Sequence, residues 1–230
     1  MNDLKSYRDN EIKWYIVAFL LLLVSVCYPS SLQVVDIDLV AKIEKLLLSS
    51  FLAGTVCTLA LVLDSFYTAN AKENLIFLGI TKMPGKTIFT RISSGKVKDI
   101  RFEVKHAQEA YREIIEAMPL AGKEKRDYEN SRWYRIFLKH EKEPKVAIAH
   151  RDYLLCRDLY TTTISLLALT AAGMLFHILQ FSWIPLVYLM ALLAVTNLAA
   201  HVKGHRFVDT VIAVDLAVDF STSKPSSIES

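Results

Sequence analysis

Apolar residues in this chain gather into long runs rather than recurring at a regular spacing. Four stretches are uncharged and almost wholly apolar: residues 14–28, 46–63, 159–179 and 183–200. An uncharged run of about 18 residues is long enough, at about 1.5 Å of rise per helical residue, to cross a hydrocarbon layer of about 30 Å. The first run is the shortest and ends at Pro29, so it crosses only with flanking residues or tilt. The pattern predicts four membrane-spanning helices.

Positive charge is distributed unevenly around these runs. Of the 27 Lys and Arg residues, 19 lie in residues 65–158, while none lies between the third run and the fourth. The positive-inside bias therefore places both termini and the central block in the cytoplasm. Residues 1–13 mix acidic with basic side chains, and no small-residue cleavage site follows the first run, which favours a retained anchor over a signal peptide.

These features predict a mainly α membrane protein of the bacterial inner membrane, with four transmembrane helices in two pairs around a small α-rich cytoplasmic domain. A soluble helical protein is the alternative, but four such apolar helices in one small protein would leave little chain to cover them. The predicted segments are a cytoplasmic N-terminal segment (1–13), a first transmembrane pair with its outer connection (14–66), a basic cytoplasmic domain (67–158), a second transmembrane hairpin (159–200) and a cytoplasmic C-terminal tail (201–230).

The central block reads as mostly helical. Residues 99–118 predict one amphipathic helix that Pro119 ends, and Asn130 or Ser131 is a candidate N-cap for a second helix. The apolar stripe of the first helix consists of Ile100, Val104, Tyr111, Ile115 and Met118.

The junctions of the central block with the spans also read as helical. Residues 65–78 are expected to extend the second span, and residues 145–160 to run straight into the third. Residues 80–95 are expected to form a loop with room for a small hairpin.

Three short patterns resemble known catalytic or metal sites and fit them poorly. Residues 79–87 (GITKMPGKT) resemble a phosphate-binding loop, but five residues separate the glycines and Pro84 removes an amide donor, so a basic turn is favoured. Residues 150–152 (HRD) lack the other parts of a kinase site. His201 and His205 lack a visible third metal ligand. We therefore expect no enzymatic activity, no cofactor and no metal.

Small and hydroxyl side chains line one face of two of the spans, and no Asp, Glu, Lys or Arg lies inside the runs, which argues against a proton-coupled carrier. The small-residue faces are candidates for helix packing within the chain or for oligomerisation. They consist of Ser50, Gly54 and Thr58 in the second span and of Ser165, Ala168 and Ala172 in the third.

Basic residues concentrate at the start of the central block, with only two acidic residues among them. This basic strip is a candidate site for an anionic partner, either a nucleic acid or nucleotide messenger, or the anionic lipid headgroups beneath the membrane. It consists of Lys82, Lys86, Arg91, Lys96, Lys98, Arg101 and Lys105.

The layout of the chain resembles that of the transmembrane subunit of retron defence systems. In sequence the resemblance rests on residues 83–87 (MPGKT), 130–137 (NSRWYRIF) and 150–160 (HRDYLLCRDLY). It implies a toxin-like inner-membrane effector of anti-phage defence that is triggered by infection, damages or depolarises the membrane, and so aborts phage growth. It also implies a reverse transcriptase with its RNA–DNA product as partners, and the spans leave a homo-oligomer open.

Two other classes of function remain open. One is a membrane-tethered adaptor that binds cytosolic anionic or protein partners without acting on the bilayer. The other is an enzyme at the membrane surface, for which the sequence shows no nucleophile or acid–base pair.

Overall fold

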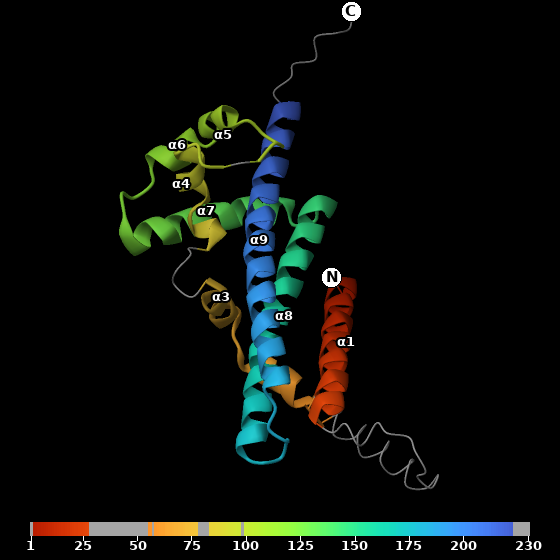
Figure 1. Cartoon of the computed structure of the whole chain (residues 1–230). Helices are drawn as coiled ribbons and strands as arrows, with labels where there is room; N and C mark the ends of the chain where they lie inside the picture. Colours follow the sequence, from red (N-terminus) through yellow and green to blue (C-terminus); the bar gives the residue numbers. More distant parts are fainter. Residues whose placement is uncertain (1, 28–54, 57, 78–82, 98, 223–230) are drawn as a thin grey trace, which may run out of the picture. The chain divides into compact units, whose positions relative to one another are not determined.

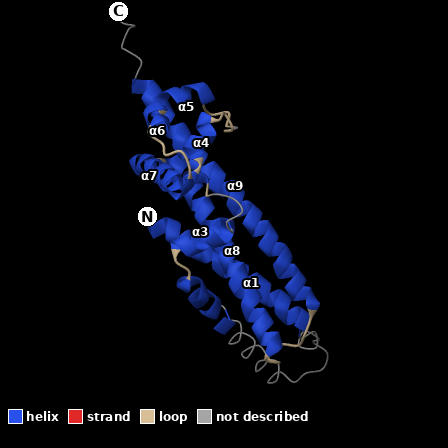
Figure 2. Cartoon of the chain, turned by 90° about the vertical axis from the view of Figure 1, so that its left-hand side faces the viewer, coloured by secondary structure: helices blue, strands red, loops and turns tan. Residues whose placement is uncertain are grey.

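The computed structural model describes residues 2–27, 55–56, 58–77, 83–97 and 99–222. Figure 2 shows helices and loops but no strand among these residues. The described part of the chain is therefore all-α, as the sequence predicts. It divides into two compact units, and each unit combines segments from distant parts of the sequence.

Unit 1 comprises residues 1–76 and 154–200. Its elements are α1 (Asn2–Cys27), the helical residues 58–66, most of α3 (Ala69–Phe77), the later part of α8 (Pro144–Leu175) and the first part of α9 (Trp183–Thr222). Apolar side chains from α1, α8 and α9 share one core, in which Ile16, Leu166 and Leu189 are fully buried. The Tyr15 hydroxyl adds a polar link between α1 and α8, at 2.7 Å from Thr163 Oγ1.

Three of the described helices are long and apolar enough to cross a membrane. The candidate spans are Tyr7–Cys27, Pro144–Leu175 and Trp183–Val218. They contain most of the first and third apolar runs and all of the fourth, and the chain is accordingly a multi-pass membrane protein. Most of the second predicted span, at residues 46–54 and 57, lies outside the described residues, so the count of four stays a prediction.

A left-handed residue ends α8 and turns the chain into α9. His177 has a φ of 58°, in a region where histidine is among the more tolerated non-glycine residues. The Ile178 amide donates to the Gly173 carbonyl at 2.8 Å, and the His177 amide donates to the Met174 carbonyl at 3.2 Å. This pattern satisfies carbonyls of the last helical turn, as in the Schellman motif.

Unit 2 comprises residues 77–153 and 201–230. Its elements are η2 (Pro84–Lys86), α4 (Ile88–Ser93), α5 (Val104–Ala110), α6 (Arg112–Glu116), α7 (Gly122–His140) and the parts of α8 and α9 that fall in these ranges.

A buried carboxylate and a close glycine contact fix the short helices of unit 2 on α7. Glu129 is 1% exposed, and it accepts hydrogen bonds from the Thr90 amide at 2.9 Å and from the Thr90 hydroxyl at 2.6 Å. Gly85 packs so closely on α7 that a β-carbon there would lie 3.0 Å from the Trp133 ring.

The predicted helix at 99–118 is wrong. The chain forms α5 and α6 instead, and Tyr111 lies at the break between them. The cause is tertiary: Tyr111 is buried, and its hydroxyl donates to Asp215, 104 residues away, at 2.7 Å. Ile100, which the predicted stripe includes, lies before α5 and is fully exposed.

Three further boundaries differ from the prediction. The loop expected at 80–95 contains η2 and α4, and α7 begins at Gly122 rather than near Asn130. Gly122 has a φ of 86°, a conformation that favours glycine, so the backbone turns into the helix there. The helix expected at 65–78 breaks at Tyr67 and Thr68, where the Thr68 hydroxyl accepts from the Ala71 amide and caps α3.

Helix α8 begins before its apolar run, and helix α9 ends after its own run. The prediction that residues 145–160 run into the third span is confirmed, because α8 is continuous from Pro144 to Leu175. The fourth helix was expected to end near residue 200, but α9 continues through Thr222.

Candidate functional site

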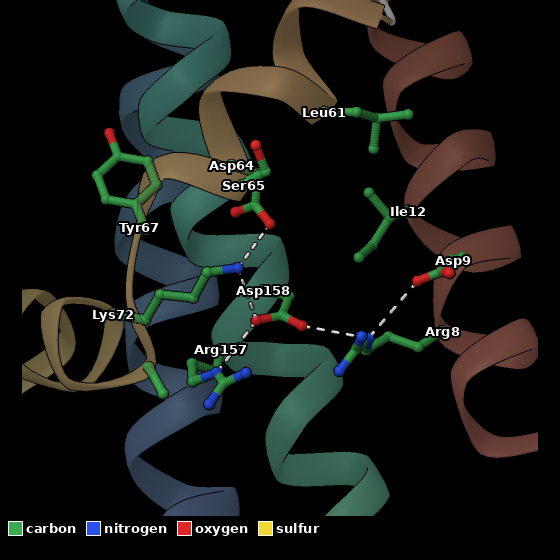
Figure 3. A pocket seen from close by; sticks show the side chains of 11 residues that line it. Arg8, Asp9, Ile12, Leu61, Asp64, Ser65, Tyr67, Lys72, Arg157 and Asp158 are labelled. Atoms are coloured by element: carbon green, nitrogen blue, oxygen red, sulfur yellow. Dashed lines mark hydrogen bonds and ion pairs between the residues drawn. The ribbon is translucent and has the colours of Figure 1, made fainter. Parts of the chain in front are cut away.

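Six charged side chains line a small cleft in unit 1 (Figure 3), and five of them meet as one group, while Asp9 lies at its edge, 3.7 Å from Arg8 Nε. They come from α1, from the helical residues 58–66, from α3 and from α8. The five are Arg8, Asp64, Lys72, Arg157 and Asp158, and we call them the Asp158 network.

Asp158 is the centre of this network. Its Oδ2 atom lies 3.2 Å from Arg8 Nε, and its Oδ1 atom lies 3.1 Å from Lys72 Nζ and 3.0 Å from Arg157 Nε. Lys72 also donates to Asp64, whose other oxygen accepts from the Thr161 hydroxyl at 2.7 Å. One carboxylate on α8 therefore connects to α1 and α3, and Lys72 extends the connection to Asp64.

The network is buried enough to act as a unit. The side chains of Asp158 and Lys72 are 4% and 9% exposed, so both have lost most of their hydration. Desolvating such ions costs several kcal/mol each, which close pairing and hydrogen bonds must offset. Removing Asp158 would take the shared partner from Arg8, Lys72 and Arg157, and Lys72 alone would keep a second close carboxylate, Asp64. The connection between the segments therefore depends most on Asp158.

The sequence places these charges at the ends of apolar segments. Asp64 directly follows the run at 46–63, and Asp158 directly precedes the run at 159–179. The turn at Thr68 brings Lys72 on α3 back to both carboxylates. Sequence reasoning missed this network because Lys72 and Asp158 are 86 positions apart. The available signal was an acidic residue next to each of two apolar runs.

In unit 2 the end of α9 is the element on which the other helices pack. Phe207 lies in the middle of an aromatic cluster, and its ring stacks on that of His150 with centroids 4.8 Å apart. The cluster also includes Trp133, Phe137 and Tyr153. This part of α9, which the sequence indicated only as a tail, is therefore the core of the unit.

Polar groups continue this packing along α9. Arg91 of α4 pairs with Asp209 at 2.9 Å, and Arg101 donates to the Thr210 hydroxyl at 2.8 Å. Asp215 accepts from Tyr111, and its other oxygen lies 2.8 Å from His140 Nε2. Contacts on α9 thus fix the position of α4, of the α5–α6 break and of the end of α7.

The predicted basic strip does not form one uniform surface. Arg91 and Arg101 are engaged with α9, and Arg101 also pairs with Asp99. Lys96 and Lys105 are exposed, and Lys86 is half-buried. Lys82 and Lys98 lie outside the described residues. Among the described residues of the strip, the structure therefore leaves two lysines exposed to a partner.

The two predicted small-residue faces have different outcomes. Ser165 is buried in unit 1, whereas Ala168 is exposed and Ala172 is half-buried. Thr58 is exposed, and Ser50 and Gly54 lie outside the described residues. Helix packing at Ser165 is present in the structure, and the oligomerisation role of these faces stays a prediction.

The three patterns that resemble catalytic or metal sites have packing roles where they are described. Gly85 lies against Trp133, and His150 packs on Phe207. Asp152 pairs with Lys203 at 2.9 Å, and His201 contacts the Phe77 ring edge-on. Among the described residues, no group of three or more His, Cys, Asp or Glu side chains could hold a metal ion.

Comparison of the chain with protein families, with curated proteins and with solved structures gives no match.

Proposed function

We propose that this chain is the inner-membrane effector of a retron-type anti-phage defence system, which depolarises the membrane when infection triggers it. The observation that carries the proposal is the Asp158 network, a buried set of ion pairs among candidate membrane helices. A protein that only anchors partners has no need of such a network, because apolar packing of similar volume is often as stabilising.

In the proposed mechanism the Asp158 network stabilises the resting arrangement of the helices in unit 1. While the charges are paired, the helices present apolar surfaces to lipid and the bilayer stays sealed. Separating the segments would release three cationic and two anionic side chains, which attract water into the bundle. The resulting conductance would be poorly selective, because a selective filter needs ordered rings of charge or carbonyls.

The trigger acts on unit 2 in this proposal. Both α8 and α9 contribute residues to unit 2 and to unit 1, so a rearrangement of unit 2 has a covalent path into the membrane helices. The partner that binds there is a reverse transcriptase with its RNA–DNA product, or a nucleotide messenger. A membrane-tethered adaptor would use the same surfaces without any change in unit 1.

A potential-sensitive dye, read while the chain is produced in growing bacteria, tests the proposal. We expect the parent chain to depolarise the cells once it is overproduced without its partners. Lys72→Met removes the amine that joins Asp64 to Asp158, and should depolarise the cells at a several-fold lower amount of membrane-inserted protein. Asp9→Asn is the matched control, because Asp9 is half exposed and lies 3.7 Å from Arg8.

Two results would count against this function. A steady potential with the parent chain, both on overproduction and during phage infection with its partner genes present, would contradict the effector and favour the adaptor. If the parent chain depolarises the cells but Lys72→Met inserts and behaves as Asp9→Asn does, the effector function is supported. The result would contradict the role of the Asp158 network in holding the resting state.

A further inference from the structure

The outer surface of α7 combines apolar and cationic side chains in two parallel rows. The buried side of the helix carries Trp133, Ile136 and Phe137, which pack into unit 2. The opposite side of its C-terminal half is the surface that we call the α7 patch. It consists of Ser131, Arg132, Tyr134, Arg135, Leu138 and Lys139.

One row of the α7 patch is apolar and exposed. Tyr134 is 50% exposed and Leu138 is 47% exposed, and Leu138 follows four positions after Tyr134, so they lie one helical turn apart on the same face. Ser131 continues this row by one turn toward the start of the helix. A single exposed apolar residue needs no explanation, but a tyrosine and a leucine on one face make a small amphipathic wedge.

The neighbouring row is cationic, and no acidic residue lies between its members along the helix. Arg135 and Lys139 are exposed one turn apart, and like charges at this spacing repel each other. Arg132 lies over the ring of Tyr128, with its guanidinium carbon 5.1 Å from the ring centre. Residues 130–140 contain no Asp or Glu, and within the described chain none of these three cations forms an ion pair.

We propose that the α7 patch binds the anionic surface of the lipid bilayer. Arg132, Arg135 and Lys139 would contact lipid phosphates, and Tyr134 and Leu138 would enter the boundary between headgroups and acyl chains. A basic row beside an apolar row is the pattern of helices that lie in a membrane interface. Cationic side chains near an anionic leaflet are each stabilised there, and the attraction falls off within a Debye length.

Two observations favour lipid over a nucleic acid as the occupant. An exposed leucine gains nothing from a phosphate backbone, whereas it gains from transfer out of water into lipid. Helix α8 begins after residues 141–143 and continues through its polar first half into the apolar run at 159–179, within a candidate span. A bilayer that α8 crosses is thus tethered to the patch at high effective concentration, while a soluble partner has to be recruited.

The proposal does not rest on the proposed function, and it is tested on the full chain in lipid nanodiscs. An environment-sensitive fluorophore is attached at Ser131→Cys, in a chain whose Cys27, Cys57 and Cys156 are replaced by serine. We expect its emission to shift to the blue in nanodiscs of equal parts phosphatidylcholine and phosphatidylglycerol, compared with phosphatidylcholine alone. High salt should reverse much of the shift. A fluorophore at Glu113→Cys on α6, which is also exposed, should respond to neither lipid.

A charge-matched pair of variants identifies the residues responsible. Arg135→Glu combined with Lys139→Glu should abolish the blue shift, whereas Lys96→Glu combined with Lys105→Glu, also exposed, should leave it intact. Three results would overturn the proposal: no shift in the anionic nanodiscs, an equal shift in neutral nanodiscs, or a shift that a single-stranded oligonucleotide produces in neutral nanodiscs. The comparison of anionic with neutral nanodiscs uses no charge variant, so it tests the proposal even if a charge variant fails to fold.

Discussion

Units 1 and 2 use charge in different ways. In unit 1 one carboxylate, Asp158, pairs with three cations from three segments, and its side chain is 4% exposed. In unit 2 several ion pairs join one cation to one acidic residue, as between Arg91 and Asp209, and Asp152 pairs with two cations, Arg151 and Lys203. Those pairs orient helices that apolar contacts already keep in place. Ion pairs are thus gathered on one buried carboxylate in unit 1 and dispersed in unit 2, where the buried Glu129 bonds to the neutral Thr90 instead.

The difference matters for how each unit would change. A shared, buried network is weakened most by the loss of its central carboxylate, because three cations then lose the same partner at once. Separate pairs at the edge of an apolar core are lost singly and at small cost. We therefore expect the helices of unit 1 to rearrange between two states, and those of unit 2 to adjust gradually.

The largest expected effect comes from the centre of the network. Asp158→Ala should lower the free energy of unfolding by about 3–5 kcal/mol, because it leaves the buried cations of Arg8, Lys72 and Arg157 without their shared partner. Denaturant titration of the purified chain in detergent micelles measures this. Asp9→Asn should change the same quantity by less than about 0.5 kcal/mol. Equal effects of the two variants would contradict the contrast between the units.

An intermediate effect is expected from the packing of unit 2. In Gly85→Ala the new methyl group would lie 3.0 Å from the Trp133 ring and 3.1 Å from Asn130 Oδ1, which should cost about 1–3 kcal/mol in free energy of unfolding. The clash is with the Trp133 ring, so combining Gly85→Ala with Trp133→Phe should cost less than the sum of the single changes. Additive costs in the same denaturant titration would show that the contact with Trp133 is not responsible.

The sequence could predict the parts of the fold that depend on local composition. Long uncharged runs locate α1, α8 and α9, and the absence of a helix breaker after Pro144 predicts the continuous α8. It could not predict features that depend on distant partners. The break at Tyr111 exists because of Asp215, 104 residues away.

The same distinction applies to the candidate site. Lys72 and Asp158 each read as ordinary charges at a helix end, and only the turn at Thr68 brings them together. The basic strip was defined by composition alone, which did not indicate that Arg91 and Arg101 face α9. The α7 patch lies within the helix that the sequence predicts from Asn130 or Ser131, but only the structure shows that this side of the helix is exposed.

The smallest effect is expected from a peripheral pair of unit 2. Hydrogen bonds from the Arg101 guanidinium lower the pKa of Asp99, and those bonds together with the Asp99 charge raise the pKa of Arg101. Arg101 is 39% exposed and solvent screens the pair, so Asp99→Asn should lower the free energy of unfolding by at most about 1 kcal/mol at neutral pH.

The sign of its pH dependence follows from the lowered pKa of Asp99. The folded state favours the ionised carboxylate, so the contribution of Asp99 is present above the unperturbed value of about 4 and is lost as pH falls through the lower folded pKa. Arg101 stays charged throughout this range. The stability difference between the parent chain and Asp99→Asn should therefore vanish in acid, and it should shrink at high salt as well. A difference that persists unchanged in acid would mean that Asp99 acts through its shape and neutral hydrogen bonds. The pair of Asp99 with Arg101 would then not count as an ion pair in the comparison of the two units.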